Sequence, residues 1–150
     1  RPRGWLSVDC RRSNPYPLLQ TCDAPRGNKA GTRRVRSNTP LQALTLANDN
    51  SFFELAQGLA TRILTDGPDD DTGRLLYAFR VCLSREPSDQ EFAVLTQFFE
   101  QQRKRFQAAQ MDAAKVAPTV RPKGVGVAEA AAWTATARVF LNLDEFITRE

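Results

Sequence analysis

Three arginines have the type and spacing that most suggest chemistry in this sequence: Arg33, Arg34 and Arg36. They directly precede Thr39-Pro40, a predicted helix start. The first turn of a helix offers free N–H groups and a partial positive charge, and guanidinium groups form charge-assisted hydrogen bonds with oxyanions. The sequence therefore predicts an anion-binding site that also includes Thr39. The alternative is that the arginines form structural ion pairs, with Asp23, Asp49 and Glu54 as the candidate carboxylates.

The chain contains no histidine, which excludes Ser-His and Cys-His nucleophilic pairs and any His-ligated zinc or haem. Cys10, Cys22 and Cys82 are too far apart for a CxxC element. A disulfide between Cys10 and Cys22 stays open, while Cys82 lies in an apolar helical pattern and is predicted to be a buried thiol. We therefore expect no catalytic residue, no metal site and no cofactor in this stretch of chain.

Two acidic runs contain residue types that could form a site. Asp69-Asp70-Asp71 lacks the alternating ligands, central Gly and distal Glu of a calcium loop. Carboxylates also stabilise a helix N-terminus, and we expect that role for this run. Asp144-Glu145 could be half of an acid/base pair, but no second carboxylate at a suggestive spacing accompanies it, so we expect it to be solvated.

Positive charge is concentrated near the N-terminus. Residues 1–36 hold nine basic and two acidic residues, net +7, whereas the remainder is net −3. Such asymmetry is typical of a polyanion partner, or of a basic arm that lies on an acidic body. No recognised nucleic-acid motif is present, so nucleic acid is an improbable partner and an anionic polymer is the better one.

A length of 150 residues suits one helical domain with its own core. No apolar run approaches the roughly 18–20 residues of a membrane span, and because no apolar run follows the first residues we expect no signal peptide in this stretch. The chain does not begin with Met. We therefore expect a C-terminal fragment of a larger protein, with upstream domains of the same polypeptide as partners.

The pattern of breakers and apolar residues divides the chain into an irregular basic arm over 1–38 and a helical body over 39–150. The predicted fold class is all-α, a compact bundle of about five helices with the arm wrapped on it. The expected helices cover about residues 40–47, 51–65, 71–84, 88–115 and 128–143.

Local signals set these boundaries. Thr39 is the predicted N-cap of the first helix, with Leu41 and Leu44 on its apolar face. Ser51 and Ser88 each precede a Glu by three residues, which predicts two capping boxes. Residues 116–127 hold two Pro and two Gly and are predicted to form an exposed, mobile loop.

Several runs resemble a family. In order they are Arg12-Ser13-Asn14-Pro15-Tyr16-Pro17-Leu18-Leu19, Asp23-Ala24-Pro25, Arg33-Arg34-Val35-Arg36-Ser37-Asn38-Thr39-Pro40-Leu41-Gln42-Ala43-Leu44 with Asn48-Asp49, Ala78-Phe79-Arg80, Ser84-Arg85-Glu86-Pro87 and Phe140-Leu141-Asn142-Leu143-Asp144-Glu145-Phe146. Together they resemble the C-terminal part of PSD-one, a planctomycete domain of unknown function. The resemblance covers nearly the whole chain. One departure is Gly31, where the family often has Cys before the Thr-Arg-Arg element.

The resemblance implies a setting rather than a reaction. It implies a large exported or cell-envelope protein, often with a cytochrome-c-like segment upstream and a role in the use of complex polysaccharides. Two function hypotheses follow. The first is a non-catalytic helical interaction module that binds a partner or an anionic polymer. The second is an enzyme fragment that acts on complex polysaccharides and supplies arginines to a site completed by upstream domains.

Overall fold

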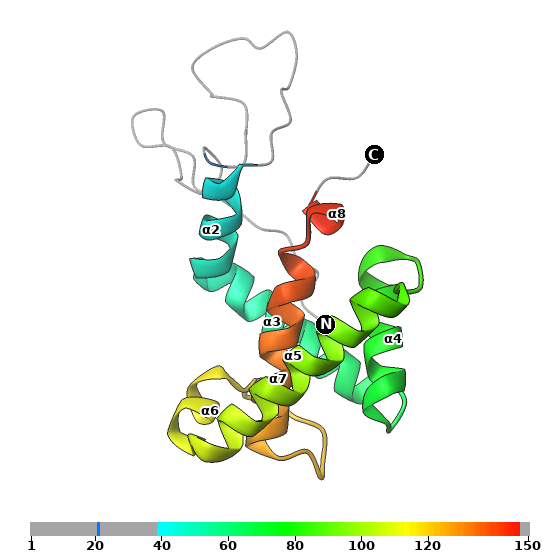
Figure 1. Cartoon of the computed structure of the whole chain (residues 1–150). Coiled ribbons are helices and arrows are strands. Elements are labelled where there is room, and N and C mark those ends of the chain that lie inside the picture. Colours follow the sequence, from blue (N-terminus) through cyan, green and yellow to red (C-terminus); the bar gives the residue numbers. More distant parts are fainter. Residues whose placement is uncertain (1–20, 22–38, 148–150) are drawn as a thin grey trace, which may run out of the picture. The chain divides into compact units, whose positions relative to one another are not determined.

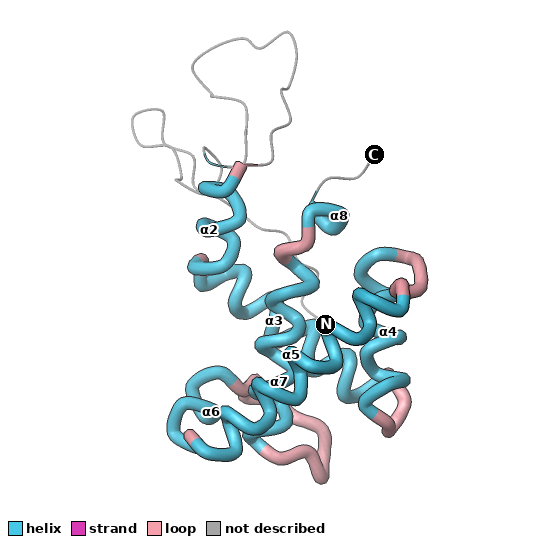
Figure 2. Tube along the Cα trace, viewed as in Figure 1, coloured by secondary structure: helices cyan, strands magenta, loops and turns pink. Residues whose placement is uncertain are grey.

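The computed structural model describes Thr21 and residues 39–147 of the chain. Every regular element within these residues is a helix, and Figure 2 shows no strand among them. The predicted all-α fold class is therefore confirmed. Seven helices are described instead of about five, because the predicted fourth helix is two helices and a short helix lies near the C-terminus (Figure 1).

The chain divides into two compact units, Arg1–Leu46 and Ala47–Glu150. Helix α2 (Pro40–Asn48) begins in the first unit, and its predicted apolar face is wrong. Leu41 and Leu44 are 63% and 59% exposed, whereas Gln42 and Leu46 are buried. The Gln42 side chain donates a 2.7 Å hydrogen bond to the carbonyl of Thr21, which satisfies its buried amide. The boundary at 38/39 and the single domain over 1–150 stay predictions.

Helices α3 (Asn50–Asp66) and α4 (Asp71–Leu83) both begin at an aspartate N-cap. Asp49 Oδ1 accepts from the N–H groups of Ser51 (2.8 Å) and Phe52 (3.3 Å). The predicted capping box at Ser51 is therefore wrong, because Asp49 takes the cap two residues earlier. Asp70 caps α4 by accepting from the Gly73 N–H at 2.7 Å, which confirms a helix-start role for the acidic run.

Helices α5 (Asp89–Ala108) and α6 (Gln110–Val116) replace one predicted long helix. The Ser88 capping box is confirmed, with Ser88 and Glu91 hydrogen-bonded in both directions. The break lies at Ala109, where the backbone leaves the helical region at φ −119° and ψ 71°. The sequence has no Gly or Pro at this point, so the local pattern gives no warning of it.

Helix α7 (Val127–Leu141) is central to the second unit, where it packs against α3, α4, α5 and α6 (Figure 1). Its sequence is rich in alanine and other small or apolar residues, which is typical of a helix that is surrounded on most of its sides. Thr134 and Thr136 are fully buried, and their hydroxyl groups donate to carbonyls one turn earlier. The short helix α8 (Asp144–Ile147) follows it.

Aromatic pairs fill the core around α7. Trp133 and Phe99 lie with ring centroids 4.4 Å apart, and Phe79 meets Phe140 edge-on at 5.2 Å. All four side chains are at most 1% exposed. Cys82 is buried as predicted, and desolvation raises its thiol pKa to about 11, so it packs as a small apolar residue.

The segment between α6 and α7 is not wholly exposed. Gln57 of α3 donates to the carbonyls of Val116 and Ala117 at 3.1 and 3.3 Å, and Ala117 is buried. Thr61, one turn further along α3, donates to the carbonyl of Val120 at 3.3 Å. The prediction of an exposed loop is therefore wrong for the first residues of the segment. None of the helices in the described residues is long and apolar enough to cross a membrane.

Candidate functional site

The predicted anion-binding site falls mostly outside the described residues. Arg33, Arg34 and Arg36 lie there, so their placement stays a prediction. Thr39 is described and caps α2, as expected. The Thr39 N–H donates to Gln42 Oε1 at 2.7 Å, and the Gln42 N–H donates to Thr39 Oγ1 at 3.3 Å.

This cap leaves few free backbone N–H groups at the start of α2 to bind an anion. The N–H groups of Thr39 and Gln42 already have acceptors, and Pro40 has no N–H to offer. The anion-binding hypothesis therefore rests on the arginine side chains. Asp49, a candidate structural partner, uses Oδ1 to cap α3.

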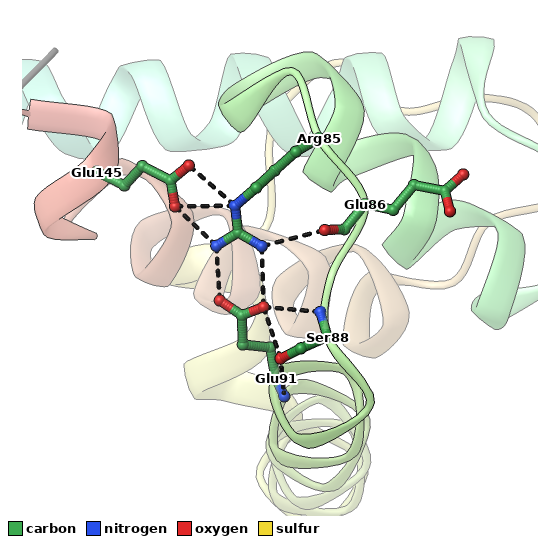
Figure 3. Close-up of polar contacts among 5 residues, drawn as sticks. All are labelled: Arg85, Glu86, Ser88, Glu91 and Glu145. Carbon is green, nitrogen blue, oxygen red and sulfur yellow. Dashed lines mark hydrogen bonds and ion pairs between the residues drawn. The ribbon is translucent and has the colours of Figure 1, made fainter. Parts of the chain in front are cut away.

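The densest polar cluster of the described residues is centred on Arg85 (Figure 3). We name it the Arg85 cluster. Its members are Arg85, Glu86, Ser88, Glu91 and Glu145. Arg85 lies in the turn between α4 and α5, directly after Ser84. Ser84 ends α4 in the left-handed region at φ 59°, and its N–H donates to the Arg80 carbonyl at 3.1 Å.

The terminal edge of the Arg85 guanidinium binds the start of α5. Nη2 and Nη1 donate to Glu91 Oε1 and Oε2 at 2.6 and 2.9 Å. Glu91 Oε2 also accepts from the backbone N–H and the hydroxyl of Ser88, at 2.8 and 2.9 Å. The capping-box glutamate therefore serves the helix and the arginine together, a bidentate arrangement that suits the planar guanidinium.

The other edge of the same guanidinium binds α8, as Figure 3 shows. Nε donates to both Glu145 oxygens at 2.9 and 3.0 Å, and Nη2 donates to Oε2 at 2.7 Å. Arg85 Nη1 also donates to the Glu86 carbonyl at 3.1 Å, and the guanidinium lies 5.5 Å from the Phe79 ring centroid. One side chain thus joins the α4–α5 turn, the first turn of α5 and the C-terminal helix.

These hydrogen bonds shift the acidities of the cluster. Hydrogen bonds from Arg85, and then from the Ser88 N–H and hydroxyl, lower the pKa of Glu91 from 4.5 to about 2. The hydrogen bond from Arg85 also lowers the pKa of Glu145. The two carboxylates in turn raise the pKa of Arg85. All three groups are therefore charged near neutral pH.

This arrangement is structural rather than catalytic. All five N–H groups of the Arg85 guanidinium already have acceptors, so none is left for a substrate oxyanion. Carboxyl groups with lowered pKa values are poor proton donors and weak bases at neutral pH. The role of the cluster is to hold three chain segments together.

Only part of this cluster could be predicted from the sequence. Its capping box was predicted, whereas Arg85-Glu86 entered only as part of a run that resembles the family. Glu145 is exposed, as expected, but it also pairs with an arginine 60 positions away, which was not predicted. No local pattern encodes that pairing.

Other charged groups of the second unit are also engaged structurally. Asp71, from the acidic run, accepts a 2.6 Å hydrogen bond from Arg103. Arg74 is largely buried and pairs with Glu129 at 3.1 Å. Across residues 39–147, no cluster of three or more Cys, Asp or Glu side chains is suited to hold a metal ion.

Comparison with known proteins gives one match. The family model described as PSD1, a protein of unknown function (DUF1553), matches residues 3–99. The match ends within α5, so the run from Phe140 to Phe146, which also resembled the family, lies beyond it. No curated protein and no solved structure matches the chain.

Proposed function

Since this chain belongs to the PSD1 family, whose function is unknown, we propose that it is a non-catalytic helical binding module of a larger exported protein. In this proposal the body packs against upstream domains, and the basic segment over residues 33–36 contacts an anionic polymer. A cell-envelope location suits such a polymer, because sulfated and carboxylated polysaccharides are found there.

The observation that carries the proposal is the contrast between the two sets of cations. Six of the eleven described cations of the second unit have carboxylate partners within it: Arg62, Arg74, Arg80, Arg85, Arg103 and Lys115. Arg121 and Arg138 donate to backbone carbonyls. The excess positive charge of the sequence lies instead in residues 1–36, with nine basic residues against two acidic ones. A surplus of this kind favours an external polyanion.

The alternative is an enzyme fragment whose arginines complete an active site built by upstream domains. The two functions differ in what the isolated chain does. A binding module retains a polyanion alone, whereas an active-site fragment needs the upstream half. Heparin is a suitable probe because it presents both sulfate and carboxylate groups on a polymer.

The test uses two double variants, each of which removes two positive charges. Arg33→Ala with Arg34→Ala removes two cations of the proposed site. Lys104→Ala with Lys123→Ala removes two exposed cations of the body that have no ion pair among the described residues. Each variant is loaded on a heparin column at low salt, and its thermal melting is followed without any anion.

We expect the chain to bind heparin weakly and to elute with modest salt, because salt screens such contacts. The Arg33/Arg34 variant should elute earlier with an unchanged or higher melting temperature, since mutual repulsion is relieved. The lysine variant should elute close to the parent. Unchanged retention with a lower melting temperature would show that the arginines are structural ties. No retention of the parent chain would instead favour the enzyme-fragment alternative.

A further inference from the structure

The loop between α6 and α7 presents a stretch of backbone to the solvent (Figure 2). Six of the eight residues from 119 to 126 are exposed: Thr119, Val120, Arg121, Lys123, Gly124 and Gly126. Apart from the first turn of α7, this stretch is fixed among the described residues by three hydrogen bonds of 3.1 to 3.3 Å and by the partly buried side chain of Val125. Exposed backbone with few hydrogen bonds opens locally at little cost, and proteases cut preferentially at such places.

Lys123 is the side chain in this stretch that a protease can recognise. It is exposed, and it forms no ion pair or hydrogen bond with the described residues. The bond that follows it is also accessible, because a Cβ added at Gly124 would meet no atom beyond its chain neighbours within 4 Å. Arg121 is the other basic residue of the stretch, but Pro122 follows it, and the proline ring in place of an N–H prevents cleavage by trypsin-like proteases.

The other basic residues of the described second unit are protected from cleavage. Eight of them lie within helices: Arg62, Arg74, Arg80, Arg103, Lys104, Arg105, Lys115 and Arg138. A helical peptide bond must unfold locally before it fits the extended cleft of a protease. Lys115 is near the end of α6, but Gln57 holds the carbonyls of the two residues that follow it. Arg85 lies in a turn, where all the N–H groups of its guanidinium already have acceptors.

The geometry points to a processing site: we infer that the Lys123–Gly124 bond is the point at which an endoprotease that recognises a basic side chain cleaves the second unit, and that the unit stays assembled afterwards. In this step one water molecule is added across the peptide bond, which leaves a carboxylate on Lys123 and an amino group on Gly124. The inference goes beyond the polyanion proposal and does not depend on it.

The cleaved unit stays assembled because its core crosses the cut. Helix α7 lies on the C-terminal side of the bond, and it packs against α3, α4, α5 and α6, which all lie on the other side. Trp133 of α7 is fully buried, and its ring centroid is 4.4 Å from that of Phe99. The ion pair between Arg74 and Glu129 also joins the two pieces. Hydrolysis of the exposed bond removes none of these contacts.

A lysine-specific endoprotease acting on the full chain under native conditions tests both parts of the inference. The chain has four lysines, and three of them, Lys104, Lys115 and Lys123, lie in the described residues. Lys123→Gln removes the proposed site. Lys104→Gln is the matched control, because Lys104 is equally classed as exposed but lies within α5. Mass spectrometry identifies each cut, and size-exclusion chromatography shows whether the pieces stay together.

We expect cleavage after Lys123 to be at least roughly tenfold faster than after Lys104 or Lys115, because proteolysis follows the population of the locally open state. Lys104→Gln should be cut after Lys123 at the parent's rate, and Lys123→Gln should stay intact over residues 39–147 for the same time. The two pieces should elute together at the parent's volume and separate only in urea. Resistance of the Lys123 bond, or equal or faster cleavage after Lys104 or Lys115, would overturn the processing site. Separation of the pieces in native buffer would overturn their assembly.

Discussion

At the scale of single residues, Arg85 shows how one guanidinium can organise a helix turn. Its two edges hold carboxylates from α5 and α8, and its face lies over a core aromatic ring. Arginine suits this position because its planar fork presents five donors in fixed directions, whereas lysine offers one compact charge. The Arg85 cluster is consequently sensitive to the ionisation of its carboxylates.

This sensitivity predicts a specific pH dependence. Arg85 and Ser88 lower the pKa of Glu91 to about 2 from an ordinary value of 4.5. A lowered pKa means that the stabilisation is fully present above about pH 4.5 and is lost as the pH falls through about 2. In Glu91→Gln, the urea midpoint should therefore change less between pH 6 and pH 2.5 than in the parent.

Gln at position 91 can still accept from Ser88, so the capping box is largely kept. Glu86→Gln serves as the control, because its side chain does not touch Arg85, and it should follow the parent curve. If Glu91→Gln and the parent lose the same stability on acidification, the Arg85–Glu91 contact does not stabilise the fold.

A second prediction at this scale concerns Phe99. Its side chain is 1% exposed and lies 4.4 Å from the Trp133 ring, centroid to centroid. Phe99→Ala should lower the free energy of unfolding by about 3–5 kcal/mol, because it removes a core aromatic and leaves a cavity. Urea melts of the variant and parent that agree within about half a kcal/mol would contradict the burial described above.

Core residues such as Phe99 could be predicted from sequence because helical spacing reports burial directly. The Arg85–Glu145 contact could not, because its partners are 60 residues apart and no periodic pattern links them. Leu41 and Leu44 show a further limit of predicting burial from the sequence. Their spacing indicates an apolar face, but Gln42 anchors that end of α2 and both leucines stay exposed.

At the scale of elements, caps decide where helices begin. Helix α3 starts at Asp49 rather than Ser51, and this gives a matched pair of variants. Asp49→Ala should destabilise the chain by about 1 kcal/mol, because the N–H groups of Ser51 and Phe52 lose their acceptor. Ser51→Ala should change stability by a few tenths at most, since position 51 lies inside the helix. If thermal melts show a larger loss of stability in Ser51→Ala than in Asp49→Ala, Ser51 and not Asp49 caps the helix.

The elements themselves were mostly predictable, because caps and apolar periodicity are local signals. The Ser88 capping box and the start of α4 agree with the sequence. The break at Ala109 was missed, since Gln-Ala-Ala-Gln carries no breaker. The deep burial of the middle of α7 was also missed in extent, because alanines and threonines give no strong apolar stripe.

At the scale of the whole molecule, the excess positive charge lies in the N-terminal residues and not in the helical body. Six of the eleven described cations of the second unit pair with carboxylates within it, as Arg74 does with Glu129, while residues 1–36 carry a net charge of +7. The sequence could predict this partition and the all-α fold. It could not predict which body cations are paired, and that pairing is the reason for assigning polyanion binding to the N-terminal segment.

The most direct test of this central claim is a titration of the chain with a fluorescent heparin fragment at low ionic strength. The parent and the Lys104→Ala/Lys123→Ala variant should bind with similar affinity. The Arg33→Ala/Arg34→Ala variant should bind roughly fivefold or more weakly, as expected for two lost exposed charge contacts. The affinity of the parent should also fall steeply as salt is added. Equal affinities for all three proteins, or a larger loss in the lysine variant, would contradict the assignment of polyanion binding to these arginines.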